Sequence, residues 1–211
     1  MKSEFILFDF DGVVVSTFKM CLDIVRRANA DETEQTLKQR FLSGDSTHDI
    51  TSLADSAGID FFAEYSKNIL DQPVVNGLTD VLEFVSQNFT TILVSSTTSP
   101  PIKKYLDHND LTKYFSALFC NDIPTPKSDK FKIIIDHFKI KPSECVFITD
   151  TVGDIREAHK VKIPSVGVTW GYHDEDMIRE GNPVATIDYP TQLKGAIEEA
   201  LDFSGEYNER H

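Results

Sequence analysis

The stretch FILFDFDGVVV, residues 5–15, decides the fold. Four consecutive apolar residues, Phe5–Phe8, predict a short strand that is buried on both faces. The run then stops at two carboxylates, Asp9 and Asp11, followed by Gly12. Carboxylates are costly to hold beside an apolar interior, so their place directly after a buried strand needs a chemical reason.

Short apolar runs alternate with helical patterns from residue 76 onward. The predicted strands are 91–94, 117–120, 145–148, 165–168 and 185–187, and the predicted helices are 78–87, 101–109, 129–138, 153–161, 175–180 and 192–201. Continuous apolar strands separated by helices are typical of parallel sheets covered on both faces. We therefore expect an α/β fold with a Rossmann-like parallel sheet that begins with strand 5–8.

Between the first and second strands the pattern is helical throughout. Helical spacing of apolar residues recurs over 18–25, 34–41, 47–57 and 62–70, and Asp45–Thr47 resembles an N-cap. A crossover between parallel strands needs only about a dozen residues. The excess, residues 15–75, is predicted to be an inserted helical lobe, with 1–14 and 76–211 forming the core.

The chain has 211 residues, 40% of them apolar, and a formal net charge of −13. This charge argues against nucleic acids and anionic membranes as partners, but one positive pocket can still bind a small anion. No segment approaches the roughly 18 apolar residues of a membrane helix, and the first residues do not resemble a signal peptide. Three widely spaced cysteines suggest neither a disulfide framework nor a zinc site, so we expect a cytoplasmic setting. The polar end, 204–211, is expected to be loose.

Polar side chains gather where the predicted strands end. They are Asp9 and Asp11 after the first strand, Ser95 and Ser96 after the second, Lys127 and Lys130 after the third, and Asp150 and Asp154 after the fourth. Ligands of open parallel sheets bind at this edge. Two carboxylates about 4 Å apart repel by about 4 kcal/mol at an effective dielectric of about 20, so protons or a cation must offset them. Hard oxygen ligands in an open site favour Mg²⁺ together with a phosphate oxygen.

The same residues have the parts of a phosphoryl-transfer site. Asp9 and Asp11 are two positions apart and can share a direction on an extended chain, so one can attack while the other handles protons. Ser95 and a lysine supply a hydrogen-bond donor and a positive charge for phosphate oxygens.

This ordered set resembles the four motifs of the haloacid dehalogenase superfamily of phosphohydrolases. That family has a strand-end Asp-x-Asp, a strand-end Ser or Thr, a Lys and a strand-end acidic motif, in this order. The counterparts here are DFDG (9–12), Ser95, Lys127 and TDTVGD (149–154), and VGVTWG (166–171) resembles the family's next strand. The resemblance runs from residue 5 to about residue 197 apart from the lobe. It is of the phosphoglycolate phosphatase and beta-phosphoglucomutase type, in which a helical cap follows the first motif.

The resemblance implies a role for each matching residue. Asp9 would be the nucleophile that forms an aspartyl-phosphate, and would also bind Mg²⁺. Asp11 would protonate the leaving oxygen and then deprotonate the hydrolytic water, with its backbone carbonyl on the metal. Asp150 would complete the metal site, and Asp154 would support that site without binding the metal itself. The phosphoryl-binding residues would be Ser95, Ser96 and Lys127, of which Ser95 and Lys127 also belong to the catalytic set.

Three positions depart from the family pattern. Thr149 stands where Gly is usual, and Lys162 stands where a Gly often ends the following helix. The usual Lys-Pro pair is also missing. We prefer Lys127 as the motif lysine because it is expected to lie before the helix begins, and Lys130 is the alternative.

The expected function is Mg²⁺-dependent hydrolysis of a small phosphorylated metabolite. The alternatives are a sugar phosphomutase of the same family, in which the phosphoryl group returns to the substrate, and a protein that binds a phosphorylated ligand without catalysis. Dehalogenase chemistry is disfavoured because dehalogenases of this family lack the second aspartate, which is Asp11 here. A phospho-accepting receiver domain gathers similar residues, but its acceptor follows a middle strand and no lobe intervenes.

Overall fold

The computed structural model describes residues 4–43, 46–122 and 124–203, with the side chains of 46–48 left aside. Its centre is a six-stranded parallel sheet in the order β3-β2-β1-β4-β5-β6. The strands are β1 (Phe5–Phe8), β2 (Thr90–Val94), β3 (Ala117–Phe119), β4 (Cys145–Thr149), β5 (Ser165–Val168) and β6 (Ala185–Ile187). β1 lies in the middle, paired with β2 on one side and with β4 on the other. The predicted α/β fold with a parallel sheet is confirmed.

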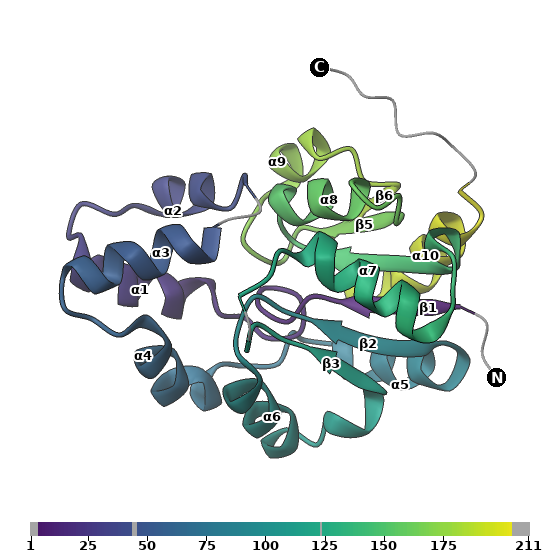
Figure 1. Ribbon diagram of the computed structural model, residues 1–211, viewed down its shortest axis with the longest axis horizontal. Helices are drawn as coiled ribbons and strands as arrows, with labels where there is room; N and C mark the ends of the chain where they lie inside the picture. Colours follow the sequence, from purple (N-terminus) through teal and green to yellow (C-terminus); the bar gives the residue numbers. More distant parts are fainter. Residues whose placement is uncertain (1–3, 44–45, 123, 204–211) are drawn as a thin grey trace.

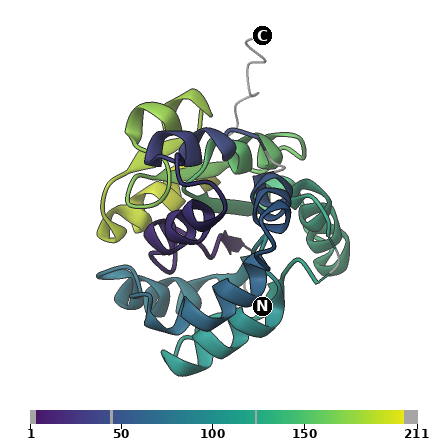
Figure 2. The same cartoon turned by 90° about the vertical axis from the view of Figure 1, so that its left-hand side faces the viewer.

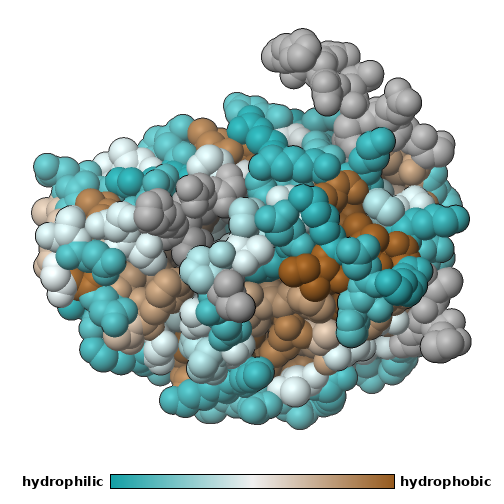
Figure 3. Space-filling view, viewed as in Figure 1, coloured by the Kyte–Doolittle hydropathy of each residue, from teal (hydrophilic) through white to brown (hydrophobic). Residues whose placement is uncertain are grey.

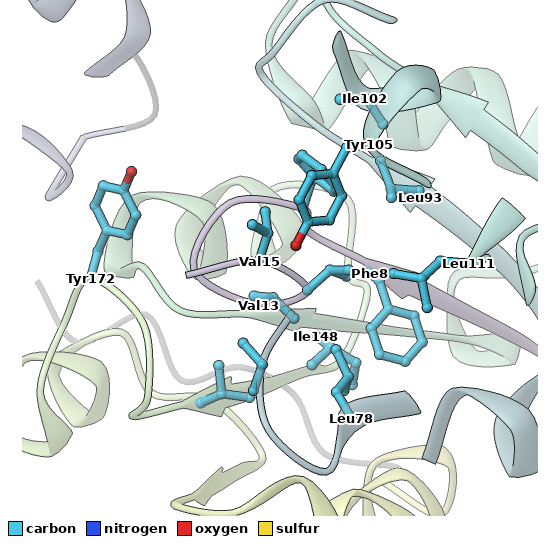
Figure 4. Close-up of a cluster of buried hydrophobic side chains, with 14 of the residues drawn as sticks. Phe8, Val13, Val15, Leu78, Leu93, Ile102, Tyr105, Leu111, Ile148 and Tyr172 are labelled. Carbon is cyan, nitrogen blue, oxygen red and sulfur yellow. The ribbon is translucent and has the colours of Figure 1, made fainter. Parts of the chain in front are cut away.

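Helices cover both faces of the sheet (Figure 1). They are α5 (Leu78–Asn88), α6 (Ser99–His108), α7 (Lys127–Phe138), α8 (Val152–His159), α9 (Glu175–Glu180) and α10 (Leu193–Leu201). Because successive strand residues point to opposite faces, Phe5 and Leu7 pack in a cluster with α7 and α8, whereas Ile6 and Phe8 pack in a larger one with α5 and α10. Figure 4 shows part of the larger cluster, including Phe8 and Leu78. β1 is therefore apolar at every position because both of its faces are covered.

Four further helices form a lobe beside the sheet, at the left in Figure 1 and facing the viewer in Figure 2. They are α1 (Phe18–Ala28), α2 (Glu34–Arg40), α3 (Ser46–Ser56) and α4 (Phe61–Asn68). The two connections of the lobe lie side by side, because Val15 pairs with Val74 and the Ser16 amide donates to the Pro73 carbonyl at 3.1 Å. Residues 15–75 thus leave and re-enter the core at one place, which supports our proposal that they form a cap domain.

Most predicted boundaries lie within one or two residues of the observed ones. One difference concerns the site: α7 begins at Lys127 and not at Asp129, so the expectation that Lys127 precedes the helix is wrong. Pro126 is the N-cap of α7, and its carbonyl accepts from the amides of Asp129 and Lys130, which closes the first turn two residues early. Short 3-10 turns lie at Ile69–Asp71, Thr112–Tyr114, Pro142–Glu144 and Pro190–Gln192. The side chains of the predicted N-cap at 45–47 and the chain end, 204–211, lie outside what the structure describes.

The surface is dominated by polar side chains. In Figure 3, hydrophilic residues cover most of the face shown, and apolar residues form patches between them. Across the described ranges, no helix combines the length and the apolar character needed to cross a membrane.

Two glycines test how tightly the sheet is packed. A Cβ on Gly167, in the buried strand β5, would lie 2.2 Å from Ile178 Cγ2, whereas a Cβ on Gly195, in α10, would meet nothing within 4 Å. We expect Gly167→Ala to lower the free energy of unfolding by about 1–3 kcal/mol, because the strand and α9 must move apart. Gly195→Ala should raise it by about 0.5 kcal/mol through helix propensity. Urea unfolding of both variants measures this, and equal effects would contradict the packing described here.

Candidate active site

The candidate site lies beside β1, where the strand order of the sheet changes direction. From β1 the chain continues to β2 on one side, while β4 lies on the other, so a crevice is expected at the carboxyl ends of β1 and β4. Asp9 follows β1 directly, and Asp150 follows β4 directly. The Asp9 amide donates to the Ile148 carbonyl at 2.9 Å, which fixes the two strand ends relative to each other. Two carboxylates that are far apart in the sequence are thereby brought to one edge of the sheet.

Lys127 joins Asp9 to Asp154 in a buried chain of ion pairs. The Lys127 Nζ lies 2.7 Å from Asp9 Oδ2 and 2.6 Å from Asp154 Oδ2. The side chains of Lys127 and Asp9 are 4% and 8% exposed, so water screens this contact little. Thr149, the residue that replaces the usual Gly, donates through its hydroxyl to the same Asp154 oxygen at 3.1 Å.

The two carboxylates share this ammonium unequally. Burial raises the pKa of Asp9 well above its usual range, even though Lys127 opposes that rise. Burial also acts to raise the pKa of Asp154, but Lys127 and the hydrogen bonds to Asp154 lower that pKa overall. Asp154 is thus the better compensated of the two, and Lys127 alone does not fully offset the negative charge that Asp9 has when it is ionised.

Asp150 is fully buried, and one of its two carboxylate oxygens accepts no hydrogen bond from the described residues. Its Oδ2 accepts from the Tyr172 amide at 2.7 Å, whereas its Oδ1 is buried and has no hydrogen-bond partner among the described residues. A Cβ on Gly12 would lie 1.9 Å from Asp150 Oδ2, and a Cβ on Gly171 would lie 2.2 Å from it, so both positions require glycine to leave room for the carboxylate. Burial raises the pKa of Asp150 to about 7, against the Tyr172 amide that lowers it.

The carboxylate oxygens at this edge of the sheet are suited to binding a hard divalent cation. Asp9, Asp11 and Asp150 are buried carboxyls whose pKa values are all raised by that burial, and a cation would offset their charge and take up the free oxygen of Asp150. Within the described part of the chain, no three or more His, Cys, Asp or Glu side chains form a metal-binding cluster. The ligand set that the family resemblance implies, the carboxylates of Asp9 and Asp150 with the Asp11 carbonyl, contains only two carboxylates, and Mg²⁺ prefers few protein carboxylates.

Asp11 accepts hydrogen bonds from both the lobe and the core. The Tyr65 hydroxyl, from α4 of the lobe, donates to Asp11 Oδ1 at 2.7 Å, and the Thr97 hydroxyl, from the loop after β2, donates to Oδ2 at 2.9 Å. Burial raises the pKa of Asp11, and hydrogen bonds from Tyr65, Thr17 and Thr97 only partly oppose this. Asp11 is therefore a carboxyl that keeps its proton more readily than an exposed aspartate.

Ser95 and Lys130 lie outside the lining of the cavity that the carboxylates share, whereas Ser96 and Thr97 belong to it. Ser95 is fully buried, and its hydroxyl oxygen accepts from the Thr97 amide at 2.9 Å, while Ser96 and Thr97 line the cavity over the strand ends. The Lys130 Nζ donates to the Ser95 carbonyl at 2.6 Å. Lys127 thus faces the carboxylates, and Lys130 supports the end of β2.

A cavity of about 610 Å³, its open mouth included, lies between the strand ends and the lobe. The lobe is docked on the core by contacts at α2 and just after it. The Lys38 Nζ lies 3.0 Å from Asp174 Oδ2, the Gly153 amide donates to the Phe41 carbonyl at 3.1 Å, and Arg156 Nη1 donates to the Leu42 carbonyl at 2.9 Å. The sheet side of the cavity is polar, and the lobe side is largely apolar.

The structure brings Asp9, Asp11, Lys127, Asp150 and Asp154 to the lining of one cavity. The sequence reasoning missed three residues that hold them. They are Tyr65, Thr97 and Tyr172. Thr97 lies two residues beyond Ser95 and Tyr172 follows the VGVTWG stretch, so proximity to the motifs could have indicated both. Tyr65 lies in the lobe, where nothing in the sequence distinguishes it from other buried aromatics.

Lys130 provides a pH-dependent test of this arrangement. Burial, reinforced by the charge of Lys127, lowers the pKa of Lys130 to about 8 from 10.5. The folded state therefore loses this proton before the unfolded chain does, and its contribution to stability rises between pH 8 and 10.5. The difference in unfolding free energy between the wild type and Lys130→Met should increase by roughly 3 kcal/mol over that window. Urea unfolding at several pH values measures it, with Lys132→Met, an exposed lysine of the same helix, as the matched control for the substitution itself. A flat difference for Lys130→Met would contradict the buried position.

Comparison with known proteins agrees with the resemblance of the motifs. Residues 6–168 match the family model described as haloacid dehalogenase-like hydrolase. Two curated phosphoglycolate phosphatases are 30% identical, that of Agrobacterium fabrum over 61% of this chain and 57% of its own length, and that of Escherichia coli over 43% and 37%. The chain thus matches less than two thirds of the length of either relative. The crystal structure of a predicted phosphatase from Clostridium acetobutylicum shares the fold, with a TM-score of 0.78 at 18% identity, covering 94% of this chain and 100% of that one. The chain belongs to the haloacid dehalogenase-like hydrolases.

Proposed function

We propose that the protein hydrolyses a small phosphomonoester in a Mg²⁺-dependent reaction that passes through an aspartyl-phosphate on Asp9. The observation that carries this proposal is the buried Asp9–Lys127–Asp154 chain beside the free oxygen of Asp150. It combines a nucleophile, a cation for phosphoryl oxygens and a place for a metal ion in one cavity. The relatives named phosphoglycolate phosphatases support the same class of reaction.

Asp9 attacks the phosphorus through a carboxylate oxygen, and the bond from phosphorus to the leaving oxygen breaks. Asp11 gives its proton to that leaving oxygen, and then takes a proton from the water that attacks the aspartyl-phosphate. Inorganic phosphate leaves, and Asp9 is free again. Lys127 lies against Asp9 throughout and offsets charge on the phosphoryl oxygens, while Ser96 offers a hydroxyl from the cavity wall. Ser95 stays a predicted donor to the same group.

Asp9, Asp150 and the Asp11 carbonyl would hold Mg²⁺. The ion supplies positive charge that lets two anions, the carboxylate and the phosphate, approach each other. Asp154 has its charge offset by Lys127, and so would support the site by fixing that lysine rather than by binding the ion.

The position of the lobe over the strand ends favours a small substrate. It is connected through two adjacent segments near Val15 and Val74, which suits a lid that opens for substrate and closes over the strand ends. A closed lid excludes water and leaves room for a small ligand, and the charge of −13 disfavours long polyanions. Small phosphorylated metabolites are therefore the proposed substrates, and phosphoproteins and nucleic acids are expected to be poor ones.

The nucleophile can be tested by a single amide substitution. Asp9→Asn keeps the shape of the side chain but removes the attacking oxygen, so turnover should fall by roughly 10⁴-fold or more. A phosphate-release assay on the folded variant measures this, and Asp136→Asn, an exposed position on α7, is the matched control that should keep full activity. Wild-type turnover by folded Asp9→Asn would remove Asp9 from its proposed role.

Metal binding has a readout that does not depend on turnover. A calorimetric titration should show that Mg²⁺ binds the wild type. Thermal unfolding should show a higher melting temperature with Mg²⁺ present, because the ion binds the native state selectively. Asp150→Asn should weaken binding by at least about tenfold. Since the pKa of Asp150 is about 7 without the ion, binding should release protons and strengthen as the pH rises through 7. Binding that is equally tight in Asp150→Asn, or independent of pH, would place the ion elsewhere.

Tyr65 connects the lobe to Asp11, and its role can be separated from stability. Tyr65→Phe removes the hydroxyl that donates to Asp11, and Tyr105→Phe removes a comparable buried one that donates to the Gln72 carbonyl at 2.9 Å. Each should cost about 1 kcal/mol of unfolding free energy. Tyr65→Phe alone should lower kcat, by roughly tenfold to a hundredfold, because Asp11 loses its orientation. Equal losses of kcat in both variants would show that Tyr65 acts through stability only.

A further inference from the structure

The wall of the cavity opposite the carboxylates is built from apolar side chains. Those that line it are Cys21, Phe41, Ile50, Phe61, Phe62 and Tyr172. The aromatic rings contact one another, with 4.6 Å between the ring centroids of Phe41 and Tyr172 and 5.7 Å between those of Phe61 and Phe62. They form a pre-arranged surface for an apolar group, because rings already packed edge to face need little reordering when a ligand arrives.

The described lysine and arginine side chains of the lobe are directed elsewhere. Arg27 and Lys67 pair with Glu64, Lys38 pairs with Asp174, Arg40 pairs with Glu32, Arg26 donates to the Glu32 carbonyl, and Lys19 lines a separate shallow pocket. Among the described residues that line the cavity, Lys127 is the one cation, and it is already paired with Asp9 and Asp154. A second anionic group on a substrate would therefore find no positive partner in this lining.

The net charge of the cavity lining also disfavours a second anionic group on the substrate. Four aspartates and one lysine line the cavity, which gives a formal charge of −3 when all are ionised, and of −2 when Asp11 holds the proton it gives to the leaving oxygen. Mg²⁺ and the phosphoryl group of the substrate bring charges that nearly cancel, so the surplus stays negative. A carboxylate on the leaving group would be repelled there, whereas an uncharged group would bury apolar surface at about 25 cal/mol per Å².

We propose that the cavity selects phosphomonoesters whose leaving group is uncharged and presents an apolar face, and that it rejects esters whose leaving group carries a carboxylate. This inference rests on the proposed phosphatase function and narrows it to a substrate class. It separates the chain from the activity that gives its 30% identical relatives their name, because the leaving group of phosphoglycolate bears a carboxylate.

A matched pair of substrates isolates the charge. Phosphoglycolate and its carboxamide, 2-phosphonooxyacetamide, have nearly the same shape and differ by one negative charge. With Mg²⁺ present, kcat/KM for the amide should exceed that for phosphoglycolate by about tenfold or more. Benzyl phosphate, which adds a ring to pack on the aromatic wall, should be hydrolysed at least as efficiently as the amide.

One substitution on the half-buried part of the wall should shift the preference. Phe62→Arg places a cation in the lining and should reduce or reverse the preference for the amide, whereas Phe62→Met, which adds no charge, should keep it. If the wild type hydrolyses these esters but prefers phosphoglycolate, the inference is overturned and the proposed function stands. If it hydrolyses none of the three under any metal condition, the proposed function falls and takes this inference with it.

Discussion

One electrostatic constraint organises the molecule: several buried carboxylates must share very little positive charge at the edge of a sheet. Lys127 Nζ lies 2.7 Å from Asp9 and 2.6 Å from Asp154, and a buried oxygen of Asp150 finds no hydrogen-bond partner in the part of the chain that the structure describes. Burying charge without compensation is costly, so the fold tolerates this arrangement only where something else completes it. A metal ion and a phosphoryl group are the natural complements, because together they bring both a cation and ligands for the remaining oxygens.

Several local features of the chain follow from this constraint. The helix α7 starts at Lys127 itself, which places the ammonium group at the strand ends rather than in solvent. Thr149 stands where glycine is usual and donates to Asp154, so this departure from the family pattern adds a contact to the charged cluster. Gly12 and Gly171 leave the room that Asp150 fills. The lobe contributes through Tyr65, which donates a hydrogen bond to the carboxyl proposed to move protons and so links the proposed lid to the proposed chemistry.

The parts of the structure that the sequence could predict are those set by local patterns. Buried strands are short apolar runs, and strand-end aspartates stand out because carboxylates seldom follow such runs. The helical lobe was predictable because its residues exceed what a crossover needs. Lys162 was noted as a departure from glycine, and its backbone is indeed left-handed with φ 61°. The rest depends on tertiary packing. The sequence could not show that Ser95 is buried behind Ser96 and Thr97, nor which helical face of α4 would direct Tyr65 toward Asp11.

The central claim is that Asp9 carries the phosphoryl group during turnover, and mass spectrometry tests it most directly. The protein is mixed with Mg²⁺ and a small phosphomonoester, quenched in acid during steady-state turnover, and digested. The account predicts a phosphoryl group on the peptide that contains Asp9, present while substrate remains and absent once it is exhausted. Steady turnover with no phosphoryl group on that peptide, or with the group on another residue, would contradict the account.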